Sequence, residues 1–229
     1  MAIKLLELRK KVQSNFKSLS LIKENLDNFI EVYEASTNAS LKKVTIKNAP
    51  IDNCWIFNNE SGEKVFISNG KKVENTIIYL DKENKKLYLF MIELKSTLDE
   101  ENLIHCRDKF QDTLSHISVY LLLNSHNENF EDIKISPLGI ICYNKEIISS
   151  SNIQNQNEYV LINDFQEYIQ NSLNNFLITM ETLALGRQVI PVISFKNNTT
   201  NDNFSIDFNE IINRATCKFK HHKQPSLSS

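Results

Sequence analysis

The chain has 229 residues, of which 41% are hydrophobic and 24% charged, so a packed globular core is expected. The 26 lysines and arginines nearly balance the 28 aspartates and glutamates. The resulting net charge of −2 excludes a basic field over the whole molecule, although local basic patches are compatible with it.

The cysteines are widely spaced and form no C-x-x-C pair. This spacing disfavours a zinc site or a disulfide framework and favours a reducing cytoplasm. The first residues mix charges with apolar side chains, which is untypical of a signal peptide. No run of about 18 apolar residues occurs, so we expect no membrane-spanning helix and no membrane partner.

The N-terminal part predicts two helices, over 2–17 and 21–35. In the second helix the expected apolar stripe is Leu26, Phe29, Ile30 and Tyr33. A strand is expected over 41–46, ended by Pro50, and a hairpin over 54–57 and 64–67.

The strongest pattern is a hairpin with strands 76–80 and 87–94, joined by the polar hexapeptide DKENKK. The second strand is a continuous apolar run, which indicates burial on both faces. It ends in Glu93-Leu94-Lys95. Because strand side chains alternate, Glu93 and Lys95 are expected on one face and Leu94 on the other.

A helix over 100–123 is expected next, capped by Asp99 or Thr97. The apolar run 138–143 predicts a buried strand parallel to the strand before the helix. Further on, the sequence predicts these elements in order: a strand 159–162, a helix 164–185, a strand 189–195 at an edge because of Pro191, a loop 197–203, a helix 208–215 and a basic tail 218–223.

One domain is expected over 1–196, and 197–229 is expected to add a loop, a short helix and a flexible basic tail. The expected parts of the domain are N-terminal helices 2–35, a core 41–145, and a C-terminal helix and strand 159–196. The predicted fold class is α/β, with a mixed central sheet flanked by helices.

The ordered pattern over about 20–145 resembles the PD-(D/E)XK nuclease superfamily, which has the restriction-endonuclease-like fold. The matching features are an acid, Glu74, before the first hairpin strand, then Glu93-Leu94-Lys95-Ser96 at the end of the second, a long helix and an apolar strand. The resemblance implies that Glu93 binds a metal ion and that Lys95 lies beside the attacking water. The usual aspartate of the family aligns with Glu74, while Asp81 and Asp52 are weaker alternatives.

The chemistry implied is metal-assisted hydrolysis. Two carboxylates brought close together repel each other unless a cation lies between them, and oxygen ligands suit Mg²⁺ or Mn²⁺. The metal ligands would be Glu74 and Glu93, with Lys95 as electrostatic stabiliser or base. Weaker substrate-binding candidates are Lys71, Lys72, Arg107, Lys109 and Gln111.

These features predict a cytoplasmic, Mg²⁺-dependent deoxyribonuclease of restriction, phage defence or repair, with DNA favoured over RNA. A homodimer is compatible with cutting both strands. The first alternative is an inactive module of the same fold that binds nucleic acid or a partner protein. The second is a structural interaction protein, in which Glu93 and Lys95 would form an exposed ion pair on an edge strand. In the tail, Cys217 with His221 and His222 would allow zinc, but a disordered tail is favoured.

Overall fold

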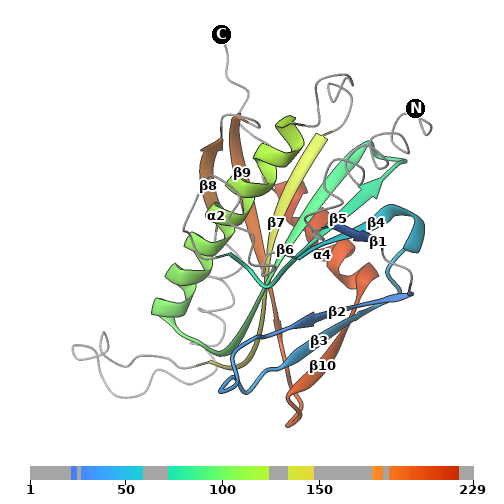
Figure 1. Cartoon of the computed structure of the whole chain (residues 1–229). Coiled ribbons are helices and arrows are strands. Elements are labelled where there is room, and N and C mark those ends of the chain that lie inside the picture. Colours follow the sequence, from blue (N-terminus) through green and yellow to red (C-terminus); the bar gives the residue numbers. More distant parts are fainter. Residues whose placement is uncertain are drawn as a thin grey trace.

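The computed structural model describes residues 22–24, 27–58, 72–123, 134–146, 177–182 and 186–221. In this part of the chain a large twisted sheet forms the centre of the molecule (Figure 1). Helix α2 (Glu100–Leu123) covers one face of this sheet, while helix α4 (Phe208–His221) and a small second sheet pack against the other. The predicted α/β class with a mixed central sheet is confirmed.

The large sheet has seven strands in the order β1-β4-β5-β6-β7-β9-β8. Their bounds are β1 Ile22–Glu24, β4 Cys54–Asn58, β5 Asn75–Asp81, β6 Lys86–Leu98, β7 Lys134–Glu146, β9 Gly186–Lys196 and β8 Leu177–Thr182. The strands β6, β7 and β9 run parallel to one another, and the remaining neighbours pair antiparallel. β6 therefore lies in the interior of a mixed sheet.

The β5–β6 hairpin forms as predicted, with Asn75 opposite Ile92 and Asp81 opposite Lys86. Asp81 shapes the turn, since its carboxylate accepts the backbone N–H of Asn84 at 3.0 Å. Lys85 completes the turn with a positive φ of 51°. The whole apolar run of β6 from Leu87 to Ile92 is buried, as its composition predicted.

Helix α2 begins after Asp99, whose carboxylate accepts the backbone N–H of Asn102 at 2.7 Å. Asp99 is therefore the N-cap, one of the two residues that the sequence allowed. The helix connects β6 to the parallel strand β7, as the strand–helix–strand pattern predicted. Gly139 of β7 lets the helix approach, because the ring of Phe110 fills the space where a Cβ would lie.

Strand β9 is an interior strand, so the edge position predicted from Pro191 is wrong. Pro191 lies where the strand changes partner. β9 pairs with β8 up to Pro191 and with β7 from Val192 onward. Proline, which has no backbone N–H, is tolerated at this position because the pairing with β8 ends there and the pairing with β7 begins at the next residue.

The second sheet has the order β10-β3-β2, with bounds β2 Phe29–Tyr33, β3 Lys43–Lys47 and β10 Asn203–Asp207. β10 pairs parallel to β3 and leads directly into α4. The boundary expected at 196 is therefore misplaced, because the chain beyond it supplies a strand and a helix with buried side chains of the common core. Residues 222–229 lie outside the described part.

The predicted helix over 21–35 is wrong, because its described residues contain the strands β1 and β2. In β2 the apolar side chains of Ile30 and Val32 alternate with more exposed ones, which is a strand pattern. The predicted helix over 164–185 is wrong for 177–182, which form β8. The helix over 2–17 and the strands over 64–67 and 159–162 were placed on residues outside the described part.

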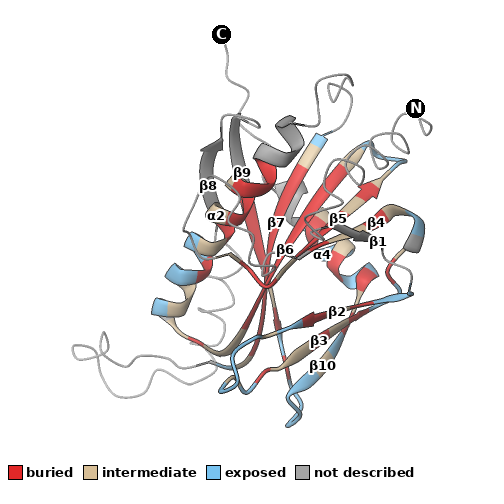
Figure 2. Cartoon of the chain, in the orientation of Figure 1, coloured by how far each residue is buried: buried red, intermediate tan, exposed pale blue. Residues whose placement is uncertain are grey.

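Two apolar cores result, one on each face of the large sheet (Figure 2). In β6, Tyr88, Phe90, Ile92 and Leu94 pack toward α4 and the small sheet. Leu87, Leu89 and Met91 pack toward α2. By the same alternation, Glu93 and Lys95 emerge on the α2 face. In the described residues, no helix is both long enough and apolar enough to span a membrane.

Candidate functional site

Glu74 and Glu93 meet across the β5–β6 hairpin. Because Asn75 pairs with Ile92, Glu74 lies opposite Glu93 in the continued register. The backbone N–H of Leu94 donates to Glu74 Oε2 at 3.0 Å, which fixes one carboxylate beside the other. Both residues are buried, with Glu93 0% and Glu74 4% exposed. The hairpin thus brings two carboxylates together inside the protein.

Two lysines complete the arrangement. Lys95 Nζ lies 2.8 Å from Glu93 Oε1. Lys109 Nζ, from α2, lies 2.6 Å from Glu93 Oε1 and 3.2 Å from Glu74 Oε1. We call Glu74, Glu93, Lys95 and Lys109 the charged cluster. Each lysine side chain is 18% exposed while the carboxylates are almost fully enclosed, so the cluster meets solvent through its lysine side chains.

Burial and the neighbouring charge of Glu93 dominate the protonation of Glu74. Burial, followed by the neighbouring charge of Glu93, raises the pKa of Glu74 well above its usual range, and Lys109 only partly offsets this. Burial lowers the pKa of Lys95, but the charge and the hydrogen bond of Glu93 together outweigh burial, so the net direction is upward. The pKa of Lys109 is likewise raised, because Glu74 and Glu93 outweigh its burial. Both lysines are therefore protonated at neutral pH.

One face of α2 supports the cluster from behind. Lys109, Thr113 and His116 follow one another at helical spacing. Thr113 Oγ1 accepts the backbone N–H of Val73 at 3.1 Å, which holds the segment immediately before Glu74 against the helix. His116 Nε2 lies 3.4 Å from Lys72 Nζ, and burial, followed by the charge of Lys72, lowers the pKa of His116 to about 4.

The weaker substrate-binding candidates have different positions. Lys109 belongs to the charged cluster. Lys72 lies beside His116, and burial lowers the pKa of Lys72. Arg107 is exposed and pairs with its neighbour Asp108 at 2.9 Å. Gln111 is half-buried and follows Lys109 by two helical positions, about 200° around the axis. Lys71 lies outside the described residues.

The alternative acids are not part of the charged cluster. Asp81 lies at the opposite end of the hairpin, where its carboxylate bonds Asn84 in the turn. Asp52 is exposed in the short helix η1 (Ile51–Asn53). Of the three acids weighed as partners of Glu93, Glu74 is the one that lies beside it. The edge-strand ion pair expected for a structural interaction protein is also wrong, because Glu93 is buried in an interior strand.

The charged cluster has one unsatisfied oxygen. Glu93 Oε2 is buried and has no hydrogen-bond partner among the described residues. A buried carboxylate oxygen without a partner is costly, and either a proton on Glu74 or a cation would satisfy it. The described residues contain no group of three His, Cys, Asp or Glu side chains that could hold a metal. Two carboxylates nevertheless fit Mg²⁺, which commonly takes one or two carboxylates and completes its shell with waters and substrate phosphates.

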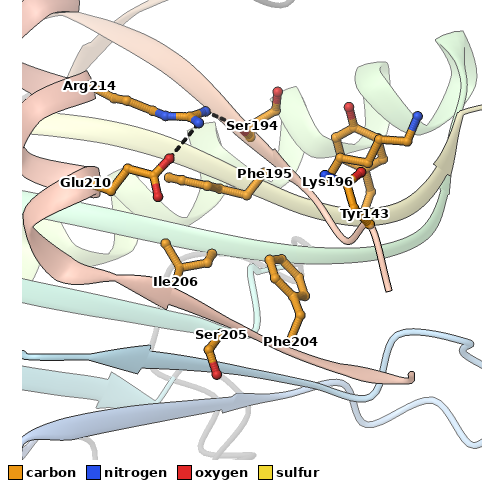
Figure 3. A pocket seen from close by; sticks show the side chains of 10 residues that line it. Tyr143, Ser194, Phe195, Lys196, Phe204, Ser205, Ile206, Glu210 and Arg214 are labelled. Carbon is orange, nitrogen blue, oxygen red and sulfur yellow. Dashed lines mark hydrogen bonds and ion pairs between the residues drawn. The ribbon is translucent and has the colours of Figure 1, made fainter. Parts of the chain in front are cut away.

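A pocket of about 280 Å³ lies elsewhere, lined by residues that include members of β7, β9, β10 and α4 (Figure 3). Arg214 bridges it, donating to Glu210 Oε1 at 2.6 Å and to the carbonyl of Ser194 at 2.9 Å. The guanidinium also lies 4.4 Å from the ring centroid of Phe195. None of the four residues of the charged cluster lines this pocket.

The sequence predicted that Glu74 and Glu93 lie together, but it did not predict the contacts of Lys109 with these two carboxylates. The helical period shows which residues share a face of α2, but not how that face is turned toward the hairpin. No sequence pattern indicated the hydrogen bond between Thr113 and Val73, because a single threonine in a helix does not predict a contact with another segment. The structure defines an α/β protein with a buried carboxylate–lysine cluster at the centre of a mixed sheet. Comparisons with family models, curated proteins and solved structures give no match.

Proposed function

We propose that this protein is a Mg²⁺- or Mn²⁺-dependent nuclease of the restriction-endonuclease-like fold that hydrolyses phosphodiester bonds in DNA. The observation that carries the proposal is the meeting of Glu74, Glu93 and Lys95 across the β5–β6 hairpin, with Lys109 2.6 Å from Glu93. The unsatisfied Glu93 Oε2 supports the proposal, because among the described residues that oxygen has no hydrogen-bond partner and can serve as a ligand for a cation.

In the proposed reaction, Glu74 and Glu93 hold the divalent ion through carboxylate oxygens. When bound, the ion supplies positive charge that polarises a phosphate and lowers the pKa of a water molecule. Lys95 places its ammonium beside the phosphate and stabilises the negative charge that develops there. The raised pKa of Lys95 supports this electrostatic role over the role of a base, since a base must first lose its proton.

The test is cleavage of plasmid and oligonucleotide DNA by the purified protein with Mg²⁺ or Mn²⁺. We expect Glu93→Gln and Lys95→Met to lower the cleavage rate by about 100-fold or more, a range typical of lost electrostatic stabilisation. Glu31→Gln is the matched control, because Glu31 forms an ion pair with Lys43 at 2.9 Å on the small sheet. No cleavage of DNA or RNA by the unaltered protein, together with no effect of Glu93→Ala on Mn²⁺ binding, would refute the proposal.

A second candidate is a non-catalytic module that binds nucleic acid or a partner protein. One observation favours it: Lys95 and Lys109 together carry two positive charges against the two carboxylates, so the cluster has no net negative charge without a metal. Titration calorimetry with Mn²⁺ separates the candidates. Binding that Glu93→Ala abolishes argues for the nuclease, and no binding by any form of the protein argues for the module.

A further inference from the structure

Lys109 differs from Lys95 in what it touches. Of the two carboxylates in the charged cluster, Lys95 Nζ contacts only that of Glu93, at 2.8 Å from Oε1. Lys109 Nζ contacts both carboxylates, at 2.6 Å from Glu93 and 3.2 Å from Glu74. Within the charged cluster, Lys109 is therefore the ammonium that lies at the point where the two Oε1 atoms converge.

This point is also where a cation shared by both carboxylates would lie. Mg²⁺ binds its oxygen ligands at about 2.0–2.1 Å. Glu74 Oε2 already accepts the N–H of Leu94, so an ion shared with Glu93 would take Glu74 Oε1, the oxygen that Lys109 contacts at 3.2 Å. An ammonium group and a divalent ion that contact the same carboxylate oxygen also repel each other strongly in a partly buried site. Occupation of the position by one of the two cations therefore excludes the other.

Lys109 is able to leave this position. Its ammonium sits on a flexible four-carbon chain with freely rotating donors. The side chain of Lys109 is 18% exposed, whereas the side chains of Glu74 and Glu93 are only 3% and 0% exposed. The displaced ammonium would move toward solvent, on the side from which an anionic phosphate must approach the enclosed carboxylates.

We propose that Lys109 is a displaceable internal cation: its ammonium fills the divalent-ion position between Glu74 and Glu93 in the metal-free protein and is released toward the substrate phosphate when the ion binds. This inference rests on the proposed metal site. It assigns Lys109 a role in controlling occupation of that site, distinct from the role of Lys95.

The test compares Mn²⁺ binding to Lys109→Met and Lys95→Met by titration calorimetry. Each substitution removes one positive charge that lies within 2.8 Å of Glu93 Oε1, so a general electrostatic effect would raise the Mn²⁺ affinity in both variants. Displacement predicts a gain of tenfold or more for Lys109→Met and a clearly smaller gain for Lys95→Met. Equal gains, or no gain for Lys109→Met, would overturn the inference.

Thermal unfolding gives a second measurement. Without metal, Lys109→Met should unfold at a lower temperature than the unaltered protein, because the two carboxylates lose their shared cation. Mn²⁺ should raise the unfolding temperature more in Lys109→Met than in the unaltered protein, since tighter binding stabilises more. Lys109→Gln, which removes the charge but keeps a polar side chain, provides the same comparison if the methionine variant does not fold. If Mn²⁺ raises the unfolding temperature equally in the unaltered protein and in the Lys109 variants, the displacement of Lys109 is wrong.

Failure of this inference can be told apart from failure of the proposed function. If the unaltered protein binds Mn²⁺ through Glu93 and cuts DNA, but Lys109→Met and Lys95→Met gain equally, the nuclease stands and displacement is wrong. If Mn²⁺ binds Lys109→Met but not the unaltered protein, displacement is supported. If no form binds Mn²⁺ and none cuts DNA, both proposals are wrong.

Discussion

At the scale of single residues, Glu93 is a charged side chain in a place that normally holds an apolar one. It follows six consecutive buried apolar residues of β6 and is itself 0% exposed. A buried ion pair is weak support for stability, because hydrophobic residues of similar volume often serve equally well or better. A contribution to folding alone therefore explains the two enclosed carboxylates poorly, which supports the proposed role as metal ligands.

Thr113 is expected to position Glu74. Thr113→Val keeps the shape of the side chain but removes the oxygen that accepts the N–H of Val73, leaving a buried donor without a partner. Such a loss costs about 1–3 kcal/mol. Urea denaturation should show this decrease, and Thr113→Ser should recover most of it by restoring the oxygen. Equal stability of the valine and serine variants would show that the hydrogen bond does not hold this segment.

At the scale of elements, the contact between α2 and β7 depends on the missing side chain of Gly139. A Cβ at this position would lie 2.7 Å from Phe110 Cε2, and Phe110 is fully buried. Gly139→Ala should therefore lower the free energy of unfolding by about 1–3 kcal/mol, the usual cost of overpacking a core. In a double-mutant cycle, Phe110→Leu should relieve part of this cost. A stable Gly139→Ala protein with no coupling to Phe110 would contradict the close packing.

The sequence predicted long elements well and short ones poorly. α2 and the β5–β6 hairpin have enough turns or alternations for their periods to be unambiguous. β2 and β8 are short apolar segments, and their spacing fits a helix as well as a strand. Pairing decides their state, since β2 bonds along β3 and β8 along β9.

At the scale of the whole molecule, the contacts that close the fold join distant parts of the chain. Asn203 to Asp207 pair residue by residue with Lys43 to Lys47. No local pattern specifies such a pairing, which explains why the segment after 196 was expected to lie outside the domain. The charged cluster was more predictable, because Glu74 and Glu93 are brought together by one local hairpin whose register its turn and apolar pattern fix.

Phe208 tests whether α4 and the small sheet fold together with the large sheet. Its ring packs edge-on against Tyr79 of β5 and Phe90 of β6, at centroid distances of 5.1 and 5.9 Å. Phe208→Ala should lower the free energy of unfolding by about 3–5 kcal/mol, the usual cost of removing a buried phenylalanine.

The single tryptophan, Trp55 in β4, reports on the large sheet, so its fluorescence can follow this unfolding in urea. If the two sheets form one cooperative unit, the Trp55 transition of Phe208→Ala shifts to lower urea together with the far-ultraviolet circular dichroism. Phe29→Ala is the matched control, since Phe29 is 44% exposed on β2 and should change stability by no more than about 0.5 kcal/mol. A Trp55 transition that stays in place while the circular dichroism shifts would mean that the segment from β10 onward unfolds separately.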